Sequence, residues 1–144
     1  MNKDVNVNIT EQQFSKNNEH FFKKILIFSE DSDFCRSLAL LFQSKYQVIY
    51  TTNLEELNAL INNERIDLLL ADSNKSDQQV YYFILNLKNQ YKNLLIVLVD
   101  IYKSFGTETK ENIHTYVDEI LLKPVEAIQM LDVIDQLFVS NLNK

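Results

Sequence analysis

Five short apolar runs divide the sequence from Lys23 onward. They are KKILIFS, YQVIYTT, IDLLLAD, NLLIVLVD and VDEILLK, at residues 23–29, 46–52, 66–72, 93–100 and 117–123. Each run is rich in Ile, Leu and Val and is too short for a helix, which is typical of β-strands. The central runs are apolar at consecutive positions rather than at alternating ones. This predicts strands that are covered on both faces, as in a parallel sheet.

Between these runs, apolar residues recur at the spacing of one helix face. The four sets are Phe34, Leu38 and Leu41; Leu54, Leu57, Leu60 and Ile61; Val80, Phe83, Ile84 and Leu87; and Ile128, Leu131, Ile134, Leu137 and Phe138. Thr52 and Glu55 have the spacing of a capping box at the start of the second helix. Residues 104–116, SFGTETKENIHTY, contain few apolar positions, so a helix there is only weakly indicated.

Strands that alternate with amphipathic helices predict βαβ crossovers and therefore an α/β fold. We expect a single flavodoxin-like domain over residues 21–144, with a doubly wound sheet of five parallel strands. Residues 1–20 are polar, rich in Asn and without helical or strand period. They predict a mobile tail that has no core of its own.

Composition narrows the range of partners. The 144-residue chain is 46% hydrophobic and has a formal net charge of −6. It can form a core, but it lacks the clustered Lys and Arg with which proteins bind nucleic acid or anionic membranes. No apolar run approaches the roughly 20 residues that span a bilayer, and the N-terminus lacks the blocks of a signal peptide. We expect a soluble cytoplasmic protein whose partners are proteins, cations or mobile phosphate donors.

Several kinds of chemistry lack the residues they need. Cys35 is the only cysteine, so neither an internal disulfide nor a thiolate metal cluster can form, and we expect a helix-side thiol. His20 and His114 have no partner at metal or catalytic spacing and are expected on the surface. The single glycine rules out a glycine-rich phosphate loop, and no nucleophile–base pair is visible. A binding domain is therefore favoured over an enzyme or a flavodoxin-like small-molecule binder.

Charged residues follow the predicted strands. Glu30 and Asp31 follow the first, Asp72 ends the third, Asp100 ends the fourth, and Lys123 ends the fifth. The carboxyl ends of parallel strands form the binding crevice of such a sheet, so these side chains should meet at one edge. Carboxylates held together repel one another unless a cation lies among them, and such oxygen ligands suit Mg²⁺. A lysine at the same edge would contact a phosphate. Together these features suggest phosphoryl chemistry.

The order of these features resembles the receiver domain of two-component response regulators, over about residues 23–140. The resemblance rests on the acidic turn after the first strand, on IDLLLAD ending at Asp72, and on LLKP at residues 121–124. It implies that a histidine kinase or phosphotransfer protein phosphorylates Asp72, while Glu30, Asp31 and Asp72 bind Mg²⁺. It also implies that Lys123 contacts the phosphoryl group and that the peptide bond before the proline is cis.

The sequence departs from the receiver pattern at the acidic turn. Receivers have two acids directly after the first strand. Helical spacing in the next segment places Ser29 and Glu30 at these two positions, whereas a shift of one residue would place Glu30 and Asp31 there. The loss of one carboxylate should weaken Mg²⁺ binding.

Three further departures concern the switch. Asp100, with Val99 as the alternative, occupies the position of the Thr or Ser whose hydroxyl bonds the phosphoryl group in receivers. Ile120 replaces the usual switch aromatic. The Pro and Gly that typically follow the acceptor are absent from ADSNKSDQQV at residues 71–80. An aspartate that faces a phosphoaspartate is repulsive, by about 1 kcal/mol at 4 Å in water.

Simpler structural roles compete with each functional one. Asp72 would cap the loop that follows it, and Asp100 would cap the next segment rather than bind a metal. Glu30 or Asp31 would cap the first helix, for which Ser32 and Asp33 are also suitable. Lys123 would be a solvated residue before a helix. Of Tyr81 and Tyr82, one should pack and one should face water, with no function assigned to either.

Two functional hypotheses follow. The first is a stand-alone atypical receiver that signals through protein–protein contacts without ordinary phosphorylation, with weak Mg²⁺ affinity at most. The second is a phosphoacceptor receiver that is phosphorylated on Asp72 in a Mg²⁺-dependent manner. In both, the partner is a histidine kinase, a phosphotransfer protein or an effector protein. It would bind the face formed by residues 104–116, the fifth strand and the last helix.

Overall fold

The computed structural model describes residues 23–73, 78–101 and 113–142. Its elements are β1 (Lys24–Phe28), α2 (Ser32–Phe42), β2 (Gln47–Thr51), α3 (Leu54–Asn63), β3 (Leu68–Asp72), α4 (Gln78–Gln90), β4 (Leu95–Ile101), β5 (Glu119–Lys123) and α6 (Ala127–Leu142). Residues 113–116 are also helical. The tail predicted at residues 1–20 and most of the weakly indicated helix lie outside the described residues.

All five strands are parallel and form one sheet in the order β2-β1-β3-β4-β5. The predicted doubly wound, flavodoxin-like fold is thereby confirmed. The strand order reverses between β1 and β3, and a doubly wound sheet opens its crevice at the carboxyl ends of the strands beside that point. The residues that end β3 and follow β1 therefore lie where such folds bind their ligands.

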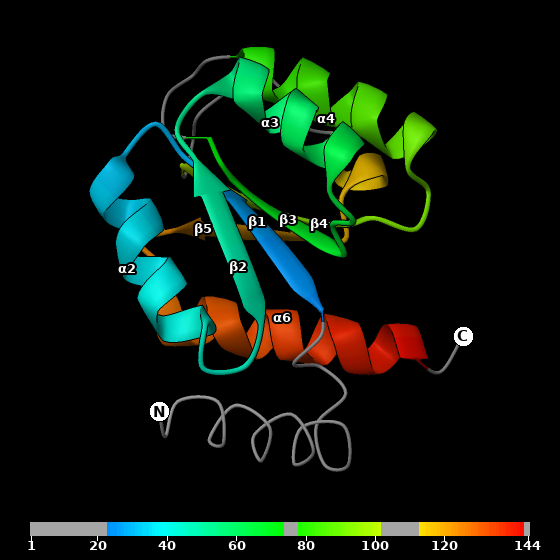
Figure 1. The fold of residues 1–144 in the computed structure, drawn as a ribbon. Coiled ribbons are helices and arrows are strands. Elements are labelled where there is room, and N and C mark those ends of the chain that lie inside the picture. Colours follow the sequence, from blue (N-terminus) through cyan, green and yellow to red (C-terminus); the bar gives the residue numbers. More distant parts are fainter. Residues whose placement is uncertain (1–22, 74–77, 102–112, 143–144) are drawn as a thin grey trace, which may run out of the picture.

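Helices cover the sheet on both faces. Figure 1 shows α3 and α4 side by side over one face, with α2 and α6 over the other. Side chains alternate along the strands between two buried clusters: Ile25 and Ile27 of β1 pack toward α2 and α6, whereas Leu26 and Phe28 pack toward α3 and α4. This two-sided burial explains why the central strands are apolar at consecutive positions.

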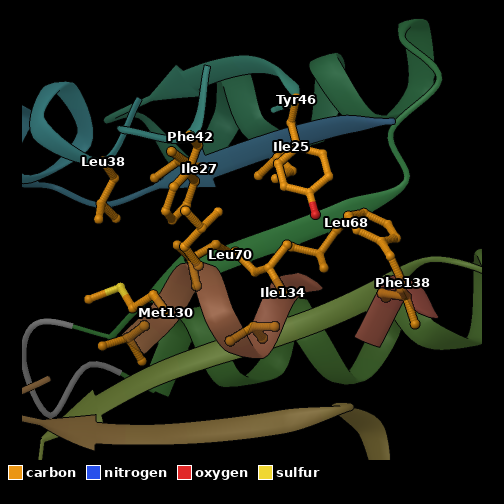
Figure 2. Close-up of a cluster of buried hydrophobic side chains, with 14 of the residues drawn as sticks. Ile25, Ile27, Leu38, Phe42, Tyr46, Leu68, Leu70, Met130, Ile134 and Phe138 are labelled. Carbon is orange, nitrogen blue, oxygen red and sulfur yellow. The ribbon is translucent and has the colours of Figure 1, made fainter. Parts of the chain in front are cut away.

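The cluster beneath α2 and α6 joins residues that are far apart in the chain. Figure 2 shows Ile25 and Ile27 of β1 and Leu68 of β3 between Phe42 of α2 and Ile134 of α6. The predicted faces of these helices are thus the faces that pack. Burial of each such side chain contributes about 1.5–3 kcal/mol, so this cluster is a main source of stability.

The N-cap of α3 differs from the predicted one, whereas the N-cap of α2 was among the predicted alternatives. Asn53 caps α3, where its side-chain oxygen accepts hydrogen bonds from the backbone N–H groups of Glu55 (2.7 Å) and Glu56 (3.3 Å). The predicted capping box of Thr52 and Glu55 is therefore wrong by one residue. Asn is as good an N-cap as Ser or Thr, and here it stands immediately before the helix. Asp31 caps α2, as the simpler interpretation of that residue predicted.

Two expectations about single side chains are confirmed. Tyr81 is fully buried while Tyr82 is 55% exposed, so one member of the pair packs and the other faces water. His114 is exposed, whereas His20 lies outside the described residues. Within the described ranges, no helix has the length and apolar character needed to cross a membrane.

Candidate functional site

Asp72 lies at the carboxyl end of the central strand β3, and only 2% of the residue is exposed. In the parallel register, Phe28 of β1 pairs with Ala71 of β3. The next residue on each side is therefore Ser29 and Asp72. The Ser29 hydroxyl donates a hydrogen bond of 2.7 Å to Asp72 Oδ2. The register of two neighbouring strands thus sets a buried hydroxyl against a buried carboxylate.

Lys123 reaches Asp72 from the far side of β4. It ends β5, and its Nζ lies 2.7 Å from Asp72 Oδ1. The Lys123 side chain is 27% exposed and that of Asp72 is 1% exposed, so water reaches the ion pair only at the lysine. The ammonium group also lies 5.5 Å from the centre of the Phe34 ring on α2, within the range of a cation–π contact. The peptide bond between Lys123 and Pro124 is cis, as predicted.

The two acids after β1 do not join Asp72. Asp31 Oδ1 accepts hydrogen bonds from the backbone N–H groups of Asp33 (3.0 Å) and Phe34 (3.2 Å), so its carboxylate caps α2. The backbone N–H of Asp31 donates to Ser29 Oγ at 3.0 Å. Glu30 is exposed to solvent. Of the two registers that the sequence allows, the structure has Ser29 in the inner position against Asp72.

The residues at this edge do not fit a Mg²⁺ site of the expected kind. Mg²⁺ has near-octahedral coordination, keeps several waters and is usually bound by one or two carboxylates together with phosphate oxygens. In the part of the chain that the structure describes, no group of three or more His, Cys, Asp and Glu side chains is placed to hold a metal ion. Asp72 has one oxygen on Ser29 and the other beside Lys123, and Asp31 is engaged in capping. Glu30, Asp31 and Asp72 are thus not gathered into one ligand set.

Asp100 lies on β4, one residue beyond Val99, which pairs with Asp72 in the register of β3 and β4. It is fully buried and accepts a hydrogen bond from the Tyr81 hydroxyl on α4. Because side chains alternate along a strand, Asp100 follows Leu98 toward α3 and α4, whereas Val99 belongs to the opposite cluster. The partners of Asp72 and Asp100 thus come from different parts of the fold.

Sequence reasoning missed the role of Tyr81. A usable signal was present, because Tyr81 shares a helix face with the buried Ile84, three residues further along. A tyrosine on the buried face of a helix needs a partner for its hydroxyl. Asp100, at the end of the fourth predicted strand, was the acid with which the Tyr81 hydroxyl could have been paired.

Cys35 lies beneath the same edge. Its Sγ is 3.6 Å from the carbonyl oxygen of Ser29 and 3.9 Å from that of Thr51, in a fully buried position on α2. Burial raises the pKa of the Cys35 thiol to about 11, opposed by the hydrogen bond to the Ser29 carbonyl and reinforced by the charge of Asp72. The thiol is therefore neutral at physiological pH and is not a reactive nucleophile.

The chain is similar to known proteins in its three-dimensional structure. No protein-family model matches the chain, and no curated protein matches it significantly. A CheY-like response regulator receiver domain protein from Methanospirillum hungatei JF-1 aligns with a TM-score of 0.74 at 19% identity, covering 85% of this chain and 98% of that one. A response regulator receiver modulated diguanylate cyclase from Pelobacter carbinolicus aligns with a TM-score of 0.68 at 23% identity, covering 85% and 97%.

An orphan response regulator of H. pylori aligns with a TM-score of 0.67 at 15% identity, covering 81% of this chain and 97% of that one. All three coverages span nearly the whole of the matched chains. Likeness at these identities establishes the architecture. The chain has the flavodoxin-like fold of CheY-like response regulator receiver domains.

Proposed function

We propose that this chain is an atypical receiver-type signalling domain that acts through protein contacts without ordinary phosphorylation. One observation carries the proposal: each carboxylate oxygen of Asp72 has a side chain of the chain itself beside it, with a hydrogen bond at Oδ2 and an ion pair without a hydrogen bond at Oδ1. Oδ2 accepts from the Ser29 hydroxyl at 2.7 Å, and Oδ1 lies 2.7 Å from Lys123 Nζ. The proposal is for a binding domain rather than an enzyme.

Phosphoryl transfer to a carboxylate places strong demands on its surroundings. An oxygen must attack in line with the leaving group, and the charge on the transferred group must be stabilised, usually with the help of a metal ion. Asp72 is 2% exposed, and among the described residues it belongs to no group of three or more acids, His or Cys that could hold a metal ion. Lys123 is the one cation among the described residues that is within ion-pair distance of Asp72. These features disfavour efficient transfer.

Asp100 also disfavours a phosphoryl group on Asp72. A receiver has a hydroxyl at this position, which would bond the phosphoryl group, whereas a second carboxylate would repel it by several kcal/mol at the effective dielectric constant of about 20 near a protein surface. The hydrogen bond from Tyr81 also engages the Asp100 carboxylate on the side of α4. A phosphoryl-driven movement of this residue toward Asp72 would have to break that bond.

A second candidate function rests on the Asp72–Lys123 pair. In receivers, a lysine at the end of the last strand contacts the phosphoryl group on the acceptor aspartate, and the 2.7 Å contact has the corresponding partners. In this alternative, a histidine kinase or phosphotransfer protein phosphorylates Asp72. The reaction would use Mg²⁺ bound weakly by Asp72 with Glu30 or Asp31.

The proposed partner is a histidine kinase, a phosphotransfer protein or an effector protein in the cytoplasm. The proposed surface consists of residues 113–116, β5 and α6, the part of the predicted partner face that the structure describes. It carries exposed apolar side chains at Leu122 (42% exposed) on β5 and Ile128 (51% exposed) on α6. Apolar groups of this kind serve as contact residues in protein interfaces.

The test compares wild-type protein with Asp72→Asn after incubation with acetyl phosphate and Mg²⁺. Intact-mass measurement is expected to show no phosphoryl adduct on either protein, while an ordinary receiver domain treated in parallel acquires one. Asp72→Asn should also leave binding to any signalling partner unchanged. A stoichiometric adduct that is lost in Asp72→Asn would overturn the proposal in favour of the phosphoacceptor alternative.

A further inference from the structure

The inner position against Asp72 holds a serine that is itself completely buried. Ser29 Oγ donates its one hydrogen to Asp72 Oδ2 at 2.7 Å and accepts from the backbone N–H of Asp31 at 3.0 Å. The Ser29 backbone is also held, because its N–H lies 3.4 Å from the Thr51 carbonyl and its own carbonyl accepts from the Cys35 thiol at 3.6 Å. The hydroxyl therefore has a fixed direction and a fixed partner.

Asp72 and the two side chains that contact it carry no net charge together without a metal ion. Asp72 carries one negative charge, Lys123 carries one positive charge 2.7 Å away, and Ser29 is neutral. A divalent cation on Asp72 would face the lysine and would leave the inner group with an excess of positive charge. Burying such an excess is unfavourable, since buried charge needs compensation by close partners of opposite sign.

We propose that Ser29 is the residue that excludes divalent cations from Asp72, and that the Ser29 hydroxyl and the Lys123 ammonium together take the place of the metal. The site is then a closed, charge-neutral group that links the carboxyl ends of β1, β3 and β5. This inference deepens the proposed function and rests on its view of Asp72 as the centre of the site. It concerns metal binding alone and requires no phosphodonor and no partner.

The proposal makes a prediction about residue 29. An aspartate there would bring a second carboxylate beside Asp72 Oδ2, where the hydroxyl now lies at 2.7 Å. Two carboxylates at that separation repel one another, and a cation between them removes the repulsion. The exposed Glu30 would supply a further oxygen from the adjacent position. Ser29→Asp should therefore create a divalent-cation site, whereas Ser29→Asn, of nearly the same size but neutral, should not.

The experiment measures binding of Mn²⁺, as a spectroscopic substitute for Mg²⁺, by loss of the free-ion paramagnetic resonance signal. Wild-type protein and Ser29→Asn are expected to show no binding at Asp72 in the millimolar range. Ser29→Asp should bind at least about tenfold more tightly, a difference of about 1.4 kcal/mol in binding free energy. Addition of Asp72→Asn to Ser29→Asp should abolish the gain. Thermal unfolding with and without Mg²⁺ provides a second readout, since a cation that binds the folded state raises its stability.

Two outcomes would overturn the proposal. The first is Mn²⁺ binding by the wild-type protein that is abolished by Asp72→Asn. The second is a folded Ser29→Asp variant that binds no better than wild type. If Ser29→Asp folds only when Mg²⁺ is added, that supports the proposal, and if it does not fold at all, Ser29→Glu decides the question by the same measurement. Acetyl phosphate is absent throughout, so phosphorylation of wild-type protein could refute the proposed function without affecting this result.

Discussion

The two edges of the sheet use aspartate in opposite ways. At the amino edge, Asp67 and Asp118 each stand one residue before a strand and remain partly open to water. At the carboxyl edge, Asp72 and Asp100 each end or nearly end a strand and are almost completely buried. Aspartate side chains are thus partly solvated at the amino edge and buried at the carboxyl edge.

The amino-edge acids are bound by backbone. Lys24 N donates to Asp67 Oδ2 at 2.8 Å while Asp67 N donates to the Lys24 carbonyl at 2.9 Å. Ile96 and Asp118 repeat this reciprocal pattern, with both distances at 2.8 Å. Each acid therefore satisfies a backbone N–H of the neighbouring strand. These contacts support the pairing of neighbouring strands.

The carboxyl-edge acids are contacted by side chains. Asp72 contacts Ser29 and Lys123, and Asp100 contacts Tyr81. Burial of a carboxylate costs several kcal/mol unless it is paired and hydrogen-bonded. Buried charges at these strand ends therefore carry a cost in stability, which points to a role beyond folding. The contrast teaches that the position of an acid in the sheet, more than its presence, marks a functional site.

Removal of the cation at the carboxyl edge should have the largest effect. Lys123→Met leaves the Asp72 carboxylate buried without its ion pair, which should lower the free energy of unfolding by about 3 kcal/mol. Chemical denaturation at neutral pH measures the loss. The double variant Lys123→Met with Asp72→Asn should recover most of it, because the buried charge is then absent. A loss below about 0.5 kcal/mol, as for an exposed pair, would mean that the two edges do not differ in this respect.

The second carboxyl-edge acid should show the next largest effect. Tyr81→Phe removes the hydroxyl that donates to the buried Asp100 while it keeps the ring in the core. The expected loss is about 1–3 kcal/mol in the free energy of unfolding, the usual cost of removing one hydrogen bond from a buried group. Tyr82→Phe is the matched control, since that side chain is 55% exposed and should be near neutral. Equal effects of the two variants would contradict the assignment.

The amino-edge acids should matter less. Asp118→Ala removes the acceptor for the Ile96 N–H, and Asp67→Ala does the same for Lys24. Each should lower the free energy of unfolding by about 1 kcal/mol, because each removes one part-buried hydrogen bond. Asp132→Ala, on the exposed side of α6, serves as the control. A loss at either position that exceeds the effect of Lys123→Met would reverse the proposed order of the two edges.

Ionisation of the Cys35 thiol should have no effect at neutral pH and should show one only at alkaline pH. The pKa of its thiol is raised from an ordinary value of 9.0 to about 11, chiefly by burial. The unfolded chain therefore releases the thiol proton first, so the stability that this group contributes is intact below about pH 9 and is lost as the pH rises toward 11. Tyrosines also ionise at alkaline pH. Chemical denaturation of wild type and Cys35→Ala from pH 8 upward separates the contribution of the Cys35 thiol, because both proteins have the same tyrosines. The difference in stability between the two proteins should shrink over that interval, and a constant difference would contradict the raised pKa.

Much of the fold is predictable from local patterns. The five apolar runs become β1 to β5, and the sets at helical spacing, such as Phe34, Leu38 and Leu41, supply the packed faces of the helices. The position of Asp72 at the carboxyl edge and its proximity to Lys123 also followed, because the geometry of a parallel sheet brings strand ends together. The prediction for α3 missed its cap, since Thr52 and Asn53 are both good caps and a difference of one residue is beyond local preference.

The sequence by itself determined the order and type of the elements, because strand and helix periods are set by which faces are withdrawn from water. Only the tertiary structure decided which side chains meet. The hydroxyl of Ser29 bonds Asp72, 43 residues away, because the register of β1 and β3 is fixed by the packing of whole faces. The capping of α2 by Asp31 is local and was among the alternatives that the sequence offered, whereas Asp100 meets Tyr81 only because α4 packs over the sheet. Such contacts depend on the relative placement of strands and helices to within an ångström, which no local pattern of residues specifies.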